Sequence, residues 1–281
     1  MAKDLKDLDL VDNFLFGTIM SDETAAPVLG RTILKSIFQR DFQKLKIRSE
    51  HVIWPCSEKL HGIRLDAYIE ENRAELVHGG GEIYDIEPDK RKSMKQHLPR
   101  RSRFYHSKID GALLESGKNY KDLPNVWVIF ITNFDPFGAN RMVYTIKNQC
   151  IELPEMPYED GSVTLFLYTK GREGNPPENL RKLMSYFQHT VPANAVTQEL
   201  ADIQKIVEQK KLDPKTKEAY MTLQEFINDE RDEAVEEEKQ RTEAEKQRAD
   251  SAEQEAAAAR EEIRQLKEQL AKLQSANRTE V

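Results

Sequence analysis

The aromatic residues of this 281-residue chain stop well before its C-terminus. It contains nine Tyr, eleven Phe and two Trp, and none of them lies beyond Phe226. Neither Gly nor Pro occurs after Pro214, and the remaining segment is rich in Glu, Lys, Arg, Gln and Ala, which favour helices. Bulky apolar side chains are what a core buries, so the chain must divide into a folded body and a polar helical tail. We expect one domain over residues 1–190, a helical extension over 191–228 and an acidic tail over 229–281.

Small and apolar residues recur in the tail at alternating steps of three and four positions. They are Ala249, Ala252, Ala256, Ala259, Ile263, Leu266, Leu270 and Leu273. This spacing is the heptad seam of a coiled coil, so we expect a long C-terminal helix that pairs two chains into a homodimer. A single solvated helix is the alternative, because the alanines bury little apolar area.

The charge of the chain is concentrated in the same tail. The formal net charge is −7, and the tail from Asp229 to Val281 holds 16 acids and 10 bases. The body is therefore nearly neutral and can carry a basic face, so the acidic total does not exclude nucleic acid as a partner. The N-terminus lacks the pattern of a secretory signal, and no apolar run is long enough for a membrane span. We expect no membrane partner and a cytoplasmic location.

The body alternates between helical and extended patterns. An apolar stripe of Leu10, Phe14, Leu15 and Ile19 predicts a first helix, and Thr24 could cap a second one that runs to Phe38. Further helices are expected over residues 98–115, 178–189 and 197–211, and strands over 65–70, 83–87, 126–131, 142–147 and 163–168. This order predicts an α/β fold with a mixed sheet.

Two carboxylates lie on neighbouring expected strands. Asp66 is near the start of one and Glu87 ends the next, so adjacent strands could bring them within a few ångströms. Converging carboxylates are hard to keep ionised unless a cation lies between them, and oxygen ligands of this kind suit Mg²⁺ or Mn²⁺. Asp85, Glu87 and Asp89 also share one strand face. Two ordinary surface acids are the alternative interpretation.

A basic stretch follows these acids in the sequence. Its residues include Arg91, Lys92, Lys95, Arg100, Arg101, Arg103 and Lys108, interleaved with His97, Phe104, Tyr105 and His106. Lys and Arg beside a metal-binding carboxylate pair are what a phosphodiester substrate needs. We therefore take Arg100, Arg101, Arg103 and Lys108 as candidate DNA-binding residues, with a solvated helix face as the alternative.

At this point the chain resembles a known family over roughly residues 8–190. The runs that carry the resemblance are VDNFLFGTIM, GIRLDAYIEE, EIYDIEP, LPRRSRFYHSKIDGALLESGKNYKDLPNVWVIFITNFDPFG and YEDGSVTLFLYTKG. They are similar to the Rpn family, which comprises recombination-promoting nucleases, also described as putative transposases, of the PD-(D/E)XK nuclease superfamily. The resemblance implies a restriction-endonuclease-like fold, in which helices flank a central mixed sheet, and metal-dependent DNA cleavage.

The resemblance also assigns roles to individual residues. Asp66 matches the family's aspartate after Gly-x-Arg-Leu, and Glu87 matches the acid of its Ile-Glu-x-Gln motif, so both are catalytic and metal-binding candidates. The position two beyond Glu87 is Gln in the family and Lys in the superfamily, but Asp89 stands here and could act as an extra ligand. Lys90 is a catalytic candidate if Pro88 bends the strand. Asp12 resembles an accessory metal ligand, with a helix N-cap as its alternative role.

Together these features predict a Mg²⁺- or Mn²⁺-dependent DNA endonuclease that the resemblance links to recombination or transposition. In this interpretation Asp66 and Glu87 hold the metal, and water attacks a backbone phosphate. The aspartate at position 89 motivates a second hypothesis from another class. In that hypothesis the protein is a catalytically inactive DNA-binding or scaffold protein that acts through its coiled coil.

Overall fold

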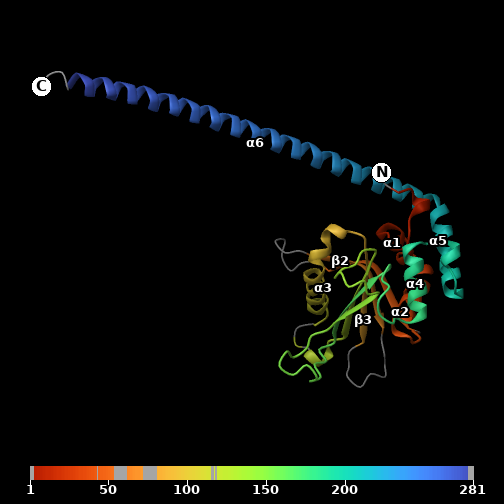
Figure 1. The fold of residues 1–281 in the computed structure, drawn as a ribbon. Coiled ribbons are helices and arrows are strands. Elements are labelled where there is room, and N and C mark those ends of the chain that lie inside the picture. The colour runs from red at the N-terminus through yellow and green to blue at the C-terminus, as the bar shows by residue number, and fades with distance from the viewer. Residues whose placement is uncertain are drawn as a thin grey trace. The chain divides into compact units, whose positions relative to one another are not determined.

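The computed structural model describes residues 3–42, 44–53, 62–71, 81–114, 117 and 119–277. The chain divides into two compact units, Met1–Tyr220 and Met221–Val281. The first unit is an α/β structure with a six-stranded mixed sheet, and this confirms the fold class that the sequence predicts (Figure 1). Residue 115 of the expected helix over 98–115 lies outside the described residues, and so do residues 54–61 and 72–80 between the strands.

The main helices are α1 (Asn13–Met20), α2 (Ala25–Phe38), α3 (Leu98–Leu113), α4 (Glu178–Gln188), α5 (Gln198–Leu212) and α6 (Pro214–Asn277). Short 3₁₀ helices are η1 (Leu5–Asp7), η2 (Lys92–His97), η3 (Tyr120–Asp122) and η4 (Pro192–Asn194). The strands are β1 (Leu45–Ile53), β2 (Ile63–Glu71), β3 (Glu82–Asp89), β4 (Asn125–Thr132), β5 (Val143–Ile146) and β6 (Ser162–Tyr168). All five strands expected from the sequence are present, and β1 was not anticipated.

The strand order in the sheet is β1-β2-β3-β4-β6-β5. β1, β2 and β3 pair antiparallel, β3, β4 and β6 pair parallel, and β5 returns antiparallel to β6. The central strand β4 is apolar and almost entirely buried, as expected for a strand covered on both faces. Parallel pairing of β3 and β4 requires a crossover, and α3 supplies it.

Helices cover both faces of the sheet. On one face, α1, α2, α4 and α5 share a large hydrophobic cluster with inward residues of the strands, including Ile69, Tyr84 and Ile129. On the other face, α3 packs over a smaller cluster that includes Phe130 and Phe166. Figure 1 shows α3 on one side of the sheet and α2, α4 and α5 on the other.

Two helices of the larger cluster, α2 and α5, differ in detail from what the sequence indicates. Thr24 precedes α2, but its side chain makes no cap hydrogen bond. Asp22 takes that role, because its Oδ1 accepts from the backbone N–H groups of Thr24 and Ala25, each at 2.9 Å. Helix α5 lies within the segment 191–228 that we expected to be an extension, and it contributes Leu200 and Ile203 to the core.

An ion network closes the end of β2 and β3 that is remote from Asp66. Glu71 and Glu82 are register partners. Arg40, just after α2, donates to both oxygens of Glu71 at 2.8 and 2.6 Å and to Glu82 at 2.9 Å. Its guanidinium carbon lies 3.7 Å from the centroid of the Phe42 ring. One cation therefore neutralises two carboxylates that face each other across the strands.

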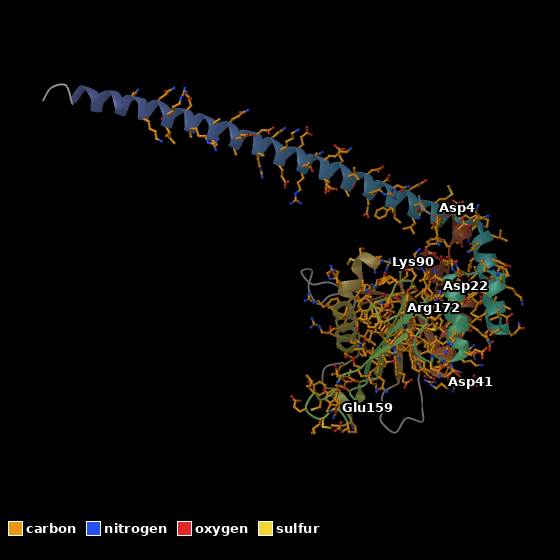
Figure 2. All side chains as sticks on the ribbon, in the orientation of Figure 1. Asp4, Asp22, Asp41, Lys90, Glu159 and Arg172 are labelled. Carbon is orange, nitrogen blue, oxygen red and sulfur yellow. The ribbon has the colours of Figure 1, made fainter. Side chains whose placement is uncertain are left out.

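The second unit consists of α6 beyond Tyr220. The helix is continuous for 64 residues, as the absence of Gly and Pro predicts. Its described side chains from residue 225 onward are exposed, and Figure 2 shows them projecting from the helix. Ile263 and Leu266 of the expected seam are 52% and 57% exposed, while the side chains of Leu270 and Leu273 lie outside the described set. Within the described residues, no helix combines the length and the apolar character that a bilayer crossing requires.

Candidate active site

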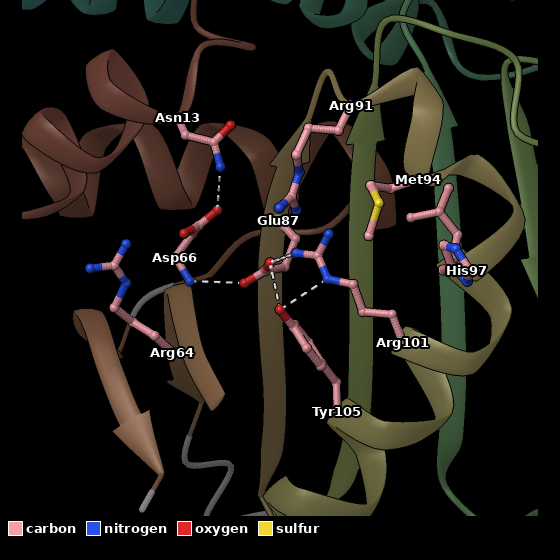
Figure 3. Close-up of a pocket in the computed structure, with 10 residues that line it drawn as sticks. Asn13, Arg64, Asp66, Glu87, Arg91, Met94, His97, Arg101 and Tyr105 are labelled. Carbon is pink, nitrogen blue, oxygen red and sulfur yellow. Dashed lines mark hydrogen bonds and ion pairs between the residues drawn. The ribbon is translucent and has the colours of Figure 1, made fainter. Parts of the chain in front are cut away.

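Asp66 and Glu87 meet across the β2–β3 pair. The antiparallel register places Ala67 opposite Ile86. Asp66 directly precedes Ala67 and Glu87 directly follows Ile86, so the two acids are brought to the same place. The backbone N–H of Asp66 donates to Oε1 of Glu87 at 2.9 Å. Figure 3 shows both side chains beside one cavity. The structure therefore brings together the two acids that the sequence singled out.

Strand β3 carries a column of acids on the face that α3 covers. Asp85, Glu87 and Asp89 alternate with residues of the opposite core, and their exposed fractions are only 0%, 1% and 1%. Neither carboxyl oxygen of Asp85 has a hydrogen-bond partner among the described residues. Buried carboxyl groups are normally paired or hydrogen-bonded, so Asp85 is an exception that a purely structural strand does not need.

Arg101 of α3 supplies the nearest positive charge. Its Nη2 donates to Oε2 of Glu87 at 2.5 Å, and its Nη1 forms an ion pair with Asp89. Its Nε donates to the hydroxyl of Tyr105 at 3.0 Å, and that hydroxyl in turn donates to Glu87 at 3.3 Å. The guanidinium lies 5.1 Å from the Tyr105 and Phe130 ring centroids. Arg101 is thus packed into the site, one helical turn before Tyr105, and does not face solvent freely.

Asp89 binds two arginines. Besides Arg101, it accepts hydrogen bonds from the backbone N–H of Arg91 at 2.8 Å and from the Arg91 side chain at 3.1 and 2.9 Å. Burial by itself raises the pKa of Asp89, but the hydrogen bonds from Arg91 outweigh it and hold the pKa below its ordinary value. Asp89 is therefore ionised and positions the two guanidinium groups.

The other acids are held toward their neutral forms. Burial raises the pKa of Asp66 to about 6, and the charges of Arg101 and Arg64 oppose this only in part. Burial, followed by the nearby Asp66, raises the pKa of Glu87 to about 8. Burial, Glu87 and Asp66 also raise the pKa of Asp85 well above its usual range. Without a further cation, these raised pKa values keep protons on Glu87 and Asp85 at neutral pH, whereas Asp66 is mostly ionised.

An open cavity of about 370 Å³ gives access to these groups. Its lining residues are Asn13, Arg64, Asp66, Glu87, Arg91, Met94, His97, Leu98, Arg101 and Tyr105. Asn13, at the start of α1, donates through Nδ2 to Oδ2 of Asp66 at 3.1 Å (Figure 3). The cavity thus combines two carboxylates at its base with three arginines on its wall, a charge pattern that suits an anionic substrate bound next to a cation.

Lys90 and Asp12 lie apart from this cavity. The Lys90 ammonium forms an ion pair with Oδ1 of Asp12, and neither residue is among those that line the cavity. Asp12 occupies the N-cap position of α1, but its side chain makes no cap bond there and instead accepts from the backbone N–H of Asp9 at 2.8 Å. Pro88 does not turn the Lys90 side chain toward Glu87, so these two candidates form a separate pair.

The basic stretch divides between two environments. Arg100 and Arg103 are exposed, whereas Arg101 points into the cavity. The ammonium of Lys108 lies 5.4 Å from the centroid of the Phe104 ring, which is 37% exposed. Arg100, Arg103 and Lys108 are therefore placed on the outside of α3, where phosphates can reach them, and Arg101 belongs to the acid site.

The donor atoms of the site fit a hard cation in kind. Mg²⁺ and Mn²⁺ prefer oxygen ligands, and Asp66 and Glu87 supply carboxylate oxygens. Within the described ranges, no three His, Cys, Asp or Glu side chains are arranged to share a metal ion. Mg²⁺ is commonly held by only one or two carboxylates, with water and substrate phosphate completing its shell. The two acids suffice for that mode of binding.

Several residues of the site were not anticipated from the sequence. Asn13, Arg64 and Met94 line the cavity but were given no role. Asn13 and Arg64 lie in runs that carry the resemblance, whereas Met94 belongs to none of them. Tyr105 had a detectable signal, because Leu98, Arg101 and Tyr105 follow one helical stripe and so share a face. Comparison of the chain with protein-family models, with curated proteins and with solved structures gives no match.

Proposed function

We propose that the protein is a metal-dependent DNA endonuclease that hydrolyses phosphodiester bonds. The observation that carries the proposal is the convergence of the half-buried Asp66 and the buried Glu87, both with raised pKa values, at the base of an open cavity with an arginine-rich wall. The resemblance of the sequence to the Rpn nucleases supports it, and so does the mixed sheet flanked by helices, which is the architecture that the resemblance implies.

In this proposal Asp66 and Glu87 hold Mg²⁺ or Mn²⁺. When bound, the metal supplies a water of lowered pKa and stabilises charge on the phosphate. Asn13 orients the Asp66 carboxylate by its hydrogen bond of 3.1 Å. The backbone N–H of Asp66 and the Tyr105 hydroxyl orient Glu87. The protein thus preorganises both ligands before a cation arrives.

The arginines would bind the scissile strand. Arg91 and Arg101 are both held by Asp89 at the cavity, so their guanidinium groups are placed for bidentate contacts with phosphate oxygens. In this arrangement Asp89 is an anchor for two positive charges and not a metal ligand. A cation that binds Glu87 would also relieve Arg101 of one of its two acidic partners and leave it available to the substrate.

A test of the anchor role uses Asp89→Gln, which installs the residue that the resembled family has there. We expect cleavage to fall by about tenfold, equivalent to ~1.4 kcal/mol of barrier, because both arginines lose their tether. The KM for DNA should rise together with this loss. An increase in the cleavage rate would show that position 89 acts on the attacking water as in the family.

Plasmid nicking tests the proposed activity. Purified protein is incubated with supercoiled plasmid and Mg²⁺ or Mn²⁺, with and without a chelator. We expect chelator-sensitive nicking that is lost in Asp66→Asn and Glu87→Gln, since each change removes a charged ligand. Glu70→Gln is the matched control, because Glu70 lies on the same strand but pairs with Arg48 and Lys46 outside the cavity. Nicking by the two site variants at the wild-type rate would refute the assignment.

A second candidate function is DNA binding without cleavage. It is favoured by Arg101, which already contacts the carboxyl groups of Glu87 and Asp89 and so competes with a metal for Glu87. This candidate predicts binding of plasmid with no nicking under any metal. The same assay, combined with a mobility shift, therefore distinguishes the two functions.

We also propose that the tail helix α6 pairs two chains into a dimer. The exposed Ile263 and Leu266 lie on the expected heptad seam of α6. Two chains joined in this way would bring two sites into one particle, which suits cleavage of both DNA strands. Light scattering on the wild type and on the double variant Leu266→Lys, Leu270→Lys tests the pairing. A monomeric wild type at micromolar concentration, or a variant of unchanged mass, would end the dimer proposal.

A further inference from the structure

A second recess lies on the other side of η2 from the acid cavity. Met94 and His97 of this short helix line the cavity, while other residues of η2 line a separate groove of about 390 Å³. The groove residues are Lys92, Ser93, Lys95, Gln96, Pro99, Pro136 and Phe137. One six-residue element thus separates the proposed catalytic centre from a surface that has had no role so far.

Phe137 presents an aromatic ring in this groove. The ring is 43% exposed although it is large and apolar. Its centroid lies 5.0 Å from that of Tyr144 and 5.0 Å from that of Phe166, with interplanar angles of 74° and 88°. These edge-to-face contacts fix the orientation of the ring, so the exposed part of Phe137 forms a rigid platform.

The loop that carries Phe137 is itself rigid. Oδ1 of Asp135 accepts from the backbone N–H groups of Phe137 at 3.0 Å and Gly138 at 2.9 Å, and Oδ2 accepts from Asn140 at 2.6 Å. Gly138 has a φ of 85°, which favours glycine and turns the chain back. The loop is held by its own hydrogen bonds, and the ring position is therefore set before any ligand binds.

The groove is positively charged. Lys92 is exposed and Lys95 is half-buried, and neither forms an ion pair with a residue that the structure describes. None of the described lining residues is acidic. Two unpaired ammonium groups beside a fixed aromatic platform are complementary to a nucleotide, which has an anionic phosphate and a flat base.

We propose that this groove binds an unpaired nucleotide of a single-stranded DNA segment, with its base stacked on Phe137 and the adjoining phosphates on Lys92 and Lys95. A base in a duplex has both faces covered by its neighbours, so stacking on a protein ring requires an unpaired base. The inference rests on the proposed DNA function and specifies its substrate as DNA with a single-stranded segment next to the cut site.

Binding without metal tests the groove apart from catalysis. Fluorescence anisotropy in chelator compares a single-stranded oligonucleotide with an oligonucleotide of the same length that contains abasic positions. The wild type should bind the complete oligonucleotide more tightly. Phe137→Leu, which keeps an apolar side chain against Phe166 but cannot stack, should weaken binding roughly five- to hundredfold and remove the preference over the abasic strand. Phe137→Trp should retain it.

Two further variants separate stacking from charge. Tyr158→Ala removes an aromatic residue of similar exposure, 52%, outside the groove and should bind like the wild type. The double variant Lys92→Gln, Lys95→Gln should weaken binding to both oligonucleotides and reduce the salt slope by about 1.4, the value for two single-strand phosphates. Circular dichroism establishes that each variant is folded.

The inference is overturned if the wild type does not distinguish complete from abasic strands, or if Phe137→Leu binds as the wild type does. Either result would leave a groove that only attracts phosphate. This assay contains no metal and measures no cleavage. A failure of plasmid nicking would therefore reject the nuclease proposal and leave the proposed nucleotide binding in the groove unaffected. A failure here would leave the nuclease proposal standing.

Discussion

The two faces of the sheet are both buried, but against different kinds of side chain. The face under α1, α2, α4 and α5 is covered by a continuous apolar cluster. The face under α3 buries fewer apolar residues and includes the acids of β3 with Arg101 between two of them. Apolar burial stabilises a fold in proportion to area, whereas buried charge costs free energy unless it is well paired. The comparison indicates that one face maintains the fold and the other maintains the site.

The largest effect is expected from a cavity in the apolar face. Phe187 is fully buried and its ring centroid lies 6.3 Å from that of Phe16. Phe187→Ala should lower the free energy of unfolding by about 3–5 kcal/mol, because it removes the ring and leaves a void. Urea unfolding measures this, with Val191→Ala at a 44% exposed position as the control. A loss below about 1 kcal/mol would mean that this face is not the principal core.

The next largest effect is the pH dependence of stability that His106, on the α3 face, should cause. His106 is buried, with Nε2 at 3.0 Å from the Thr164 hydroxyl and Nδ1 at 3.2 Å from that of Ser162. Burial lowers the pKa of His106 to about 4. In the unfolded chain the His106 imidazole has a pKa near 6.5, so it binds a proton more readily there than in the folded protein. The free energy of unfolding should therefore fall by up to about 3 kcal/mol as the pH drops from 6.5 to 4.

Comparison with His106→Gln isolates this contribution. The raised pKa values of Asp66 and Glu87 act with the opposite sign, since stability from those groups is lost as pH rises through about 6 and 8. The wild type should therefore lose more stability than the variant between pH 6.5 and 4 in chemical unfolding. Equal losses would show that folding does not lower the pKa of His106.

A smaller effect of opposite sign is expected at Asp85. Its carboxyl group is fully buried and has no hydrogen-bond partner among the described residues. Asp85→Leu keeps a branched end of similar shape and should raise the free energy of unfolding by about 1–3 kcal/mol, because an unpaired polar group leaves the interior. Asp85→Asn keeps the polarity and should change little. Destabilisation by leucine would mean that the carboxyl group has an important partner, such as water or a cation.

The smallest effect on stability is expected on the outside of α3. Arg100 and Arg103 are exposed, so replacing both by Gln should change the free energy of unfolding by less than about 0.5 kcal/mol. On the proposed function, the same change should reduce the salt slope of duplex DNA binding by about 1.8, the value for two phosphates. Arg101→Gln, on the inner side of the helix, should instead destabilise the protein. An unaltered salt slope would identify Arg100 and Arg103 as a merely solvated face.

The sequence predicts the apolar strands better than the half-exposed ones. Val126–Ile131 reads as a buried strand because its apolar run is continuous, and it lies within β4. β1 escaped prediction because it is a sheet edge with no fully buried residue, so its alternation is weak. The tail helix was predictable from composition alone, since helix formers extend without a breaker to its end.

The site was predictable where it follows strand periodicity and not where it depends on distant contacts. Asp66 and Glu87 meet because neighbouring antiparallel strands align them. Arg101 was grouped with the exposed arginines, since a basic run does not reveal which member faces inward, although its helical spacing from Tyr105 contained that information. The Lys90–Asp12 pair joins segments far apart in the chain, and no local pattern predicts such a contact.

The paired carboxylates at both ends of β2 and β3 have a consequence for how the chain folds. Antiparallel neighbours in sequence often form early as a hairpin, because their contacts are local. Here Glu71 faces Glu82 at one end and Asp66 meets Glu87 at the other, and opposed like charges disfavour a strand pair. The cations that relieve this repulsion, Arg40 and Arg101, come from outside the two strands. The isolated strand pair is therefore disfavoured until the chain after α2 and helix α3 dock against it. We expect a non-local folding nucleus that forms faster when salt screens the acids.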